Sequence, residues 1–290
     1  MTQAANASAP QTQSFRQWRH GDTLDAAITR AEQDVRTRPT DAHARWFLFE
    51  LLCVVGNWER ALKQLQTCAT MNPELDSTAQ AMRGLIRAER QREEVFAGKQ
   101  MPVPVVDLSD WMLSLARALT ANTAGNHDEA DTLRSLALAA APMSAGDGSL
   151  GTFNWFSDTD SRLGPVCEVI AAGSYRWLAF ADIQHIRIAA PTRLLDLVWA
   201  SADITLQGDT PLKVYLPVRY CGTTATTSGS SDALRMARET VWREVGSTGV
   251  FAYGQKTWMS DQGDWPLLEV REITFDSGVA PTPASAQEPA

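Results

Sequence analysis

Lysine is scarce in this chain of 290 residues. There are only four, Lys63, Lys99, Lys213 and Lys256, and acidic side chains outnumber basic ones by 34 to 26. The formal net charge is therefore −8, and the isoelectric point is about 5.1. A protein that holds nucleic acid or an anionic membrane by electrostatics needs a basic surface. The composition therefore argues against nucleic acid and against a membrane as partners.

Long apolar runs and a secretory signal are also missing. No apolar segment approaches the ~18 residues that a membrane-spanning helix needs. Residues 1–14 are mainly Ala, Gln, Thr and Ser, without a positively charged start, and we expect them to be disordered. These features predict a cytoplasmic protein.

Cysteines are few and show no metal-binding spacing. The four of them, Cys53, Cys68, Cys167 and Cys221, form no C-x-x-C pair. We expect buried free thiols in a reducing compartment, and a Cys53–Cys68 disulfide across one helical hairpin is the alternative.

Motifs for catalysis are absent as well. The chain has no phosphate-binding loop, no G-x-G-x-x-G after a predicted strand, no G-x-S-x-G and no H-E-x-x-H. The best acidic cluster is Asp158 with Asp160, which could share a metal or a proton. The simpler interpretation is that Asp160 or Ser161 caps a helix over 162–172 and that Arg162 pairs with Asp158. We therefore expect no enzyme activity, no cofactor, no metal and no catalytic residue.

What the chain does contain is a repeated glycine-to-proline unit. The central copy is GNWERA (56–61), closed by Pro73, and two fainter copies run from Gly21 to Pro39 and from Gly125 to Pro142. A glycine that ends one helix and a proline that ends the next are typical of stacked helical hairpins. The pattern predicts a tetratricopeptide-like helical domain over 15–145, with helices over 42–55, 59–71 and 77–96. The charged residues at 83–94 predict a solvated helix face, and a charged docking strip is the alternative.

Beyond residue 150 the apolar period changes. Short segments rich in aromatic and β-branched residues, bounded by Gly, Asp or Pro, predict strands. They lie at 175–180, 183–188, 204–206, 214–220, 240–245, 250–259 and 267–275. Helices are expected over 162–172 and 232–238. We predict a multi-domain protein in which an α+β domain over 150–276, with a curved or barrel-like antiparallel sheet, follows the helical domain. A tail over 277–290 and the loop 222–231 are expected to be disordered or mobile.

A partner groove follows from the repeat pattern. In stacked helical hairpins the first helix of each unit lines the inner face, and an apolar groove of this kind suits an amphipathic helix. The residues expected there are His43, Trp46, Glu50, Cys53, Met112, Leu115 and Leu119. The alternative is that the helix over 77–96 or the second domain already fills the groove.

Several strings resemble the ImpE family, also called TagJ or SciE-type proteins, which are accessory components of bacterial type VI secretion systems. They are RWFLFELLC (45–53), GNWERA (56–61), RAE (87–89), REEVFAG (92–98), DSRLGPV (160–166), GSYRW (173–177) and DLVW (196–199). The resemblance implies a cytoplasmic adaptor that binds the N-terminal helix of the small sheath subunit. It also implies a link to the ClpV-type AAA+ ATPase that dismantles contracted sheaths, and it supplies no catalytic residues.

Two other functions stay open at this point. One is a generic helical-repeat scaffold with another partner, and the other is a hydrolase in the second domain that uses Asp158 and Asp160 as its acids.

Overall fold

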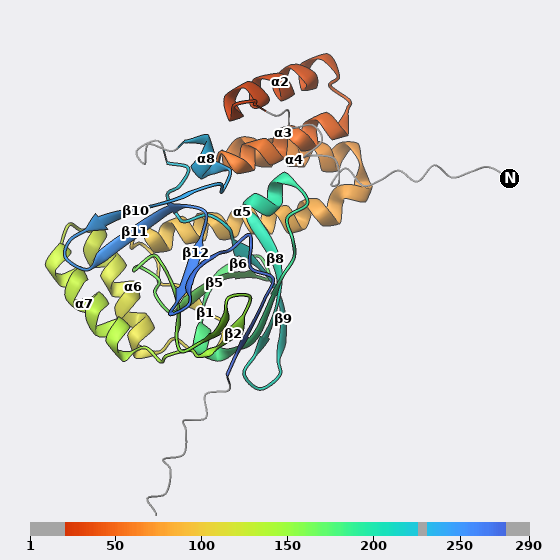
Figure 1. Ribbon diagram of the computed structural model, residues 1–290. Coiled ribbons are helices and arrows are strands. Elements are labelled where there is room, and N and C mark those ends of the chain that lie inside the picture. The colour runs from red at the N-terminus through yellow and green to blue at the C-terminus, as the bar shows by residue number, and fades with distance from the viewer. Residues whose placement is uncertain (1–20, 226–230, 277–290) are drawn as a thin grey trace, which may run out of the picture.

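The computed structural model describes residues 21–225 and 231–276. Helices come first and strands follow (Figure 1). The segments expected to be disordered at 1–14 and 277–290, and residues 226–230 of the expected mobile loop, lie outside the described residues.

The helical region begins with α2 and ends with α7. The helices predicted over 42–55, 59–71 and 77–96 each agree with an observed helix to within one residue at each end. The elements are α2 (Leu24–Thr37), α3 (Ala42–Val54), α4 (Trp58–Met71), η2 (Pro73–Leu75), α5 (Asp76–Phe96), α6 (Asp110–Thr123) and α7 (His127–Ala140). Side chains of short polar residues satisfy the first backbone N–H groups, because Asp41 caps α3 and Asn57 caps α4.

Glycines separate the two helices of each hairpin. Gly56, with φ of 73°, lies between α3 and α4, and Gly125, with φ of 82°, lies between α6 and α7. Both are in the left-handed region, which favours glycine at the end of a helix. Asn57 and Asn126 follow them and begin the next helices.

A nine-stranded sheet dominates the second half of the chain. Its order is β1-β6-β5-β9-β8-β7-β14-β2-β3, so β1 and β3 form its two edges. The barrel-like closure expected from the sequence is therefore wrong, and the sheet is open. Its strands are β1 (Val103–Pro104), β2 (Gly146–Gly148), β3 (Gly151–Phe153), β5 (Val166–Ala171), β6 (Ser174–Ala179), β7 (Ile183–Ile188), β8 (Trp199–Leu206), β9 (Pro211–Pro217) and β14 (Glu272–Phe275).

Smaller elements complete the strand-rich region. The hairpin of β10 and β11 forms a sheet of its own, and β13-β12-β4 forms another. Two 3-10 helices and one short α-helix connect these strands. Their bounds are β4 (Phe156–Asp158), η3 (Phe180–Asp182), η4 (Leu194–Leu197), α8 (Asp232–Arg235), β10 (Thr240–Val245), β11 (Gly249–Gly254), β12 (Thr257–Ser260) and β13 (Gly263–Pro266).

The helix predicted over 162–172 is wrong. Residues 161–164 form a turn, and β5 follows. Five of the six residues of β5 are buried, so the strand contacts protein on both faces. A strand buried on both faces loses the alternation that normally distinguishes it from a helix.

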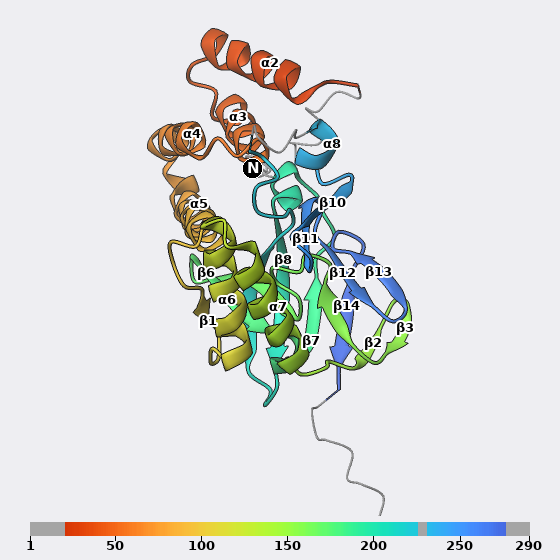
Figure 2. The same cartoon turned by 90° about the vertical axis from the view of Figure 1, so that its left-hand side faces the viewer.

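The helices and the sheet share a hydrophobic core. One cluster contains Trp46 and Leu85 of the helices together with Tyr175 and Trp199 of the strands. A second cluster, around Phe156 and Trp258, lies within the strand-rich half. β1, which comes from the connector between α5 and α6, pairs in parallel with β6. The domain limits expected at 145 and 150 stay a prediction. Figure 2 shows α2 to α5 in order along one side and β13, β14, β2 and β3 on the other.

Candidate functional site

The residues expected to line a partner groove lie on α3 and α6, and most of them are buried. His43 is exposed. The other six have at most 4 % of their surface exposed: Trp46, Glu50, Cys53, Met112, Leu115 and Leu119. The Trp46 ring packs against Phe49, and its Nε1 donates to Glu50 Oε1 at 3.0 Å. In the described chain these six side chains form core, and their role in partner binding stays a prediction.

The second half of the chain covers the C-terminal part of α3. The Arg219 guanidinium donates to the backbone oxygens of Cys53 and Val54. It is buried among carbonyl groups, and this burial lowers the pKa of Arg219 to about 10. Leu194 and Leu195 of η4 belong to the same core cluster as α3. This agrees with the alternative that the strand-rich half fills the groove.

A buried ionic network joins α5 to the sheet. Arg92 of α5 donates to both carboxylate oxygens of Glu168 of β5, at 2.7 Å from Nε and 2.9 Å from Nη2. Lys256 Nζ lies 2.7 Å from Glu168 and 2.7 Å from Asp158. Burial alone would raise the pKa of Glu168, but Arg92 and Lys256 outweigh it and hold that pKa well below its usual range. Glu168 is therefore ionised and fully paired.

Glu89, one turn before Arg92 on α5, extends this network. Its Oε1 accepts from Trp199 Nε1 at 2.9 Å, and Arg92 lies 3.4 Å away. Burial raises the pKa of Glu89 against the attraction of Arg92. Glu89 and Arg92 belong to the charged run for which the sequence predicted a solvated face, and for these two residues that prediction is wrong.

The two aspartates considered as catalytic acids are tied down separately. Asp160 is bound by the Arg162 guanidinium and accepts from the backbone N–H of Ala252. Asp158 pairs with Lys256 and accepts from the Tyr220 hydroxyl. Burial raises the pKa of Asp158 to about 6, with Lys256 opposing the shift. Arg162 thus pairs with Asp160 rather than Asp158, and no helix follows for Asp160 or Ser161 to cap.

Metal ligands do not converge in the described parts of the chain. Among residues 21–225 and 231–276, no group of three or more His, Cys, Asp or Glu side chains could hold a metal ion. The four cysteines are free, as expected, and only Cys221 is not fully buried. Burial raises the pKa of the Cys221 thiol to about 12, so it is not a reactive thiolate.

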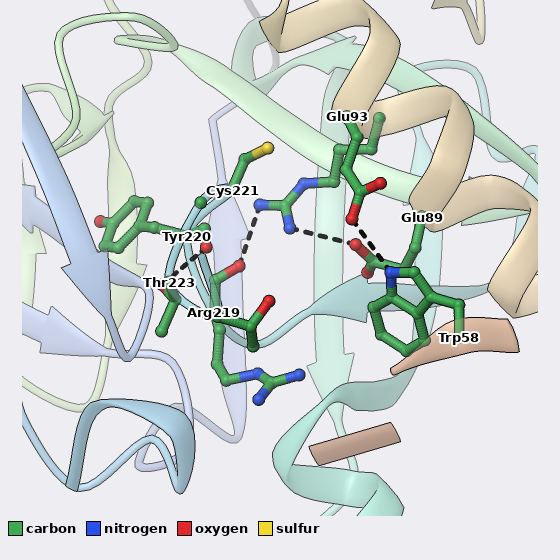
Figure 3. Close-up of a pocket in the computed structure, with 10 residues that line it drawn as sticks. Trp58, Glu89, Glu93, Arg219, Tyr220, Cys221 and Thr223 are labelled. Atoms are coloured by element: carbon green, nitrogen blue, oxygen red, sulfur yellow. Dashed lines mark hydrogen bonds and ion pairs between the residues drawn. The ribbon is translucent and has the colours of Figure 1, made fainter. Parts of the chain in front are cut away.

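A cleft opens above the network, where the two halves of the chain meet. We call it the junction cleft. It has a volume of about 540 Å³ and is lined by the end of α5, the segment 221–225, the β10–β11 hairpin and Gly56. A smaller cavity of about 30 Å³ adjoins it and shares Glu93, Cys221 and Thr224 with it. Figure 3 shows this smaller cavity, with Trp58, Glu89 and Glu93 facing the segment after β9 that carries Arg219 to Thr223.

Aromatic and charged side chains alternate around the junction cleft. Phe96 and Tyr253 contribute rings, and the guanidinium groups of Arg162 and Arg243 lie over them at 4.9 Å from the ring centres. Glu93 accepts from Trp58 Nε1 at 3.0 Å, and the Trp58 ring stacks on Trp199. Trp58 therefore packs α4 against the strand-rich half, and the rings of the cleft wall belong to α5 and β11.

Sequence reasoning missed most residues of this site. Glu168 and Arg219 lie far from each other and from Tyr253 and Lys256 in the chain, and none of the four belongs to a local motif. One signal was available, because Lys256 is one of only four lysines and lies within an apolar strand segment.

A curated protein from Pseudomonas aeruginosa, the "Type VI secretion system accessory component TagJ", is 36% identical over 253 residues, which is 87% of this chain and 88% of that protein. The model of the ImpE protein family matches residues 151–274. The chain belongs to the ImpE family. The match to the family model covers the strand-rich half, and the identity with TagJ extends the relationship into the helices.

A solved structure shares the fold of this ImpE protein. An X-ray crystal structure of a protein from Vibrio parahaemolyticus aligns with a TM-score of 0.80 and 24% sequence identity, and covers 88% of this chain and 95% of that one. At this identity the match speaks for the fold alone. Within the described residues, no helix of this ImpE protein combines the length and the apolarity needed to span a bilayer.

Proposed function

We propose that this protein is an accessory component of a type VI secretion system and acts there as a non-enzymatic cytoplasmic adaptor. The observation that carries the proposal is the 36% identity with TagJ over 87% of the chain. The buried charges support it, because Asp158, Asp160 and Glu168 are held in internal ion pairs rather than presented in an open pocket.

The partner that we propose is the N-terminal helix of the small sheath subunit. Through this contact the adaptor would influence disassembly of the contracted sheath by the ClpV-type AAA+ ATPase, either directly or by way of the sheath. The support comes from the family strings around 45–61 and 160–177 and from the helical hairpins. Gly56 and Gly125 take the same left-handed conformation in α3–α4 and α6–α7, as expected if these hairpins are tetratricopeptide-like repeats.

We place the helix in the junction cleft, because the groove residues on α3 and α6 are buried. An amphipathic helix needs an apolar floor with polar groups at the margin. Phe96 and Tyr253 provide rings, and Glu93 and Arg243 provide charges of both signs. The cleft therefore suits a helix that carries both charges beside its apolar face.

The test uses the full chain and the small sheath subunit of the same secretion system. Calorimetric titration should give a Kd in the ~10 µM range or tighter, and deletion of the subunit's first helix should abolish binding. Tyr253→Ala and Arg243→Glu should weaken binding about tenfold, since Tyr and Arg often dominate interface energies. Arg117→Glu, on the exposed side of α6, is the matched control and should bind as the wild type does.

The outcomes separate the candidate functions. Loss of binding only in the cleft variants supports both partner and place. Full binding by the cleft variants moves the helix elsewhere on the protein. If the wild type does not bind the subunit at all, the proposal fails and a scaffold with another partner takes its place.

A further inference from the structure

A second pocket lies along the first half of α5, away from the end of the helix that lines the junction cleft. It has a volume of about 360 Å³ and lies between the first half of α5, the β5–β6 turn and β9. We call it the α5–β9 pocket. Every residue that lines it is among the described residues: Gln80, Ala81, Gly84, Leu85, Arg87, Ile170, Ala172, Gly173, Lys213 and Tyr215.

The charge of the α5–β9 pocket is opposite to that of the whole chain. Arg87 and Lys213 line it and no carboxylate does, although the chain carries a net charge of −8. Asp203 is directly across the strand pair from Lys213, but it does not line the pocket. Lys213 is exposed, so its ammonium group is available to an anion from outside.

The guanidinium of Arg87 is held in place from one side. Its Nε and Nη2 both donate to the backbone oxygen of Gly173, at 3.2 and 3.1 Å. Both N–H groups of Arg87 Nη1 and the second N–H of Nη2 remain as donors, and the fixed orientation lowers the entropy lost when an anion binds them. The guanidinium can come this close to the backbone because residue 173 is glycine, since a Cβ there would lie 2.8 Å from Arg87 Nη2.

Between the two cations the pocket is mostly apolar. Leu85 and Ile170 are core residues that reach its floor, and Tyr215 is half-buried beside them. Gly84 and Gly173 contact each other closely, since a Cβ on Gly84 would lie 3.3 Å from Gly173 Cα. The absence of side chains at these two positions keeps the floor open.

We propose that the α5–β9 pocket is a second interaction site, which takes an acidic peptide segment of a partner protein. A carboxylate of the segment lies between Arg87 and Lys213, and a neighbouring apolar side chain packs on Leu85 and Ile170. The site is independent of the junction cleft, so the protein can hold one partner at each.

Charge and size select this kind of occupant. A nucleic-acid surface neutralises several phosphates, but this pocket offers only two cationic side chains, and the whole chain contains only four lysines. The volume is near the lower end of the ~300–1,000 Å³ of ligand pockets, so it holds a short segment rather than the length of a helix. Its position on an open helix–sheet surface leaves both ends of a peptide free to continue.

The experiment is selection of random peptides displayed on phage against the purified full chain, with Lys213→Glu as the counter-selecting protein. We expect enrichment of peptides with Asp or Glu next to a large apolar residue. Fluorescence anisotropy of the best labelled peptide should show binding at least about tenfold weaker for Lys213→Glu and for Arg87→Gln. The affinity should also fall as NaCl is raised, because the pocket is open to solvent.

Arg90→Glu is the matched control. Arg90 is exposed on the same helix but does not line the pocket, so this variant should bind as the wild type does. The Lys213 side chain has no hydrogen bond or ion pair to lose among the described residues, and thermal melting of each variant checks the fold. Enriched peptides without acidic residues, equal binding by Lys213→Glu, or no enrichment at all would overturn the proposal. Loss of sheath-subunit binding would bear only on the junction cleft.

Discussion

At the scale of single residues, Gly56 has two independent reasons to be glycine. Its φ of 73° strains any residue with a Cβ, and a Cβ built there would lie 2.5 Å from Thr224 Oγ1. Gly125 has only the first reason, because nothing lies within 4 Å of its Cβ position. A substitution at Gly125 therefore tests backbone strain alone, whereas the same substitution at Gly56 tests strain and steric clash together.

Alanine substitutions should show this difference. Gly125→Ala should lower the free energy of unfolding by about 1 kcal/mol through backbone strain. Gly56→Ala should lower it by roughly 2–3 kcal/mol, because the clash with Thr224 adds to the strain. Urea denaturation of both variants measures the two losses, and equal losses would contradict the steric part.

At the scale of elements, α7 holds the tip of the β10–β11 hairpin through one carboxylate. Asp131 accepts hydrogen bonds from the backbone N–H groups of Ser247 and Thr248 and from both of their hydroxyls, at 2.7 to 3.2 Å. Arg134 Nη1 lies 2.7 Å from the same carboxylate. The hydrogen bonds from Ser247 and Thr248 lower the pKa of Asp131 well below its usual range.

Asp131→Ala should release the hairpin without unfolding the protein. We expect faster amide exchange in β10 and β11, measured by mass spectrometry, while α3 and the central strands stay protected. Ser135→Ala, at an exposed position of the same helix, is the control. Uniform acceleration over the whole chain would mean that Asp131 stabilises the global fold instead.

The elements also show which parts of the fold could be predicted. Helices α3, α4 and α5 were predicted because glycine, proline and apolar periodicity mark their limits within the local sequence. β5 was mistaken for a helix because its burial on both faces removed the alternation. The site was beyond local reasoning, since Arg92 and Glu168 are 76 residues apart and Arg219 and Cys53 are 166 apart.

At the scale of the whole molecule, Glu168 is a carboxylate that binds side chains from both halves of the chain. It receives Arg92 from the helices, and Lys256 and Tyr175 from the strand-rich half. All four side chains are buried. Removing the charge would leave two buried cations partly unpaired, which costs more than the loss of an exposed pair.

Glu168→Gln should lower the free energy of unfolding by about 3–5 kcal/mol at pH 7. The pKa of Glu168 is lowered in the folded protein, so its stabilisation is present above the unfolded pKa of about 4.3 and is lost as the pH falls below it. The glutamine variant lacks this titration. The difference in free energy of unfolding between the wild type and Glu168→Gln should therefore become smaller as the pH is lowered from 5 to 3, roughly the range of carboxylate titration.

Denaturant unfolding of both proteins across this pH range measures the difference in their free energies of unfolding. Glu244→Gln, at an exposed position of β10, is the control and should follow the wild type. A difference that stays constant with pH would show that the loss comes from altered packing rather than from the charge of Glu168.

The ionic network also affects the order in which parts of the chain can pack during synthesis. Glu89 and Arg92 leave the ribosome with α5, and Arg92 precedes Glu168 by 76 residues and Lys256 by many more. Until those residues are synthesised, the helices cannot bury the two charges against their partners, and the face of α5 that carries them stays in water. We therefore expect final packing of the helices to wait for β12, and the nascent chain to expose core residues such as Leu85 and Trp46 until then, when it most needs protection by chaperones.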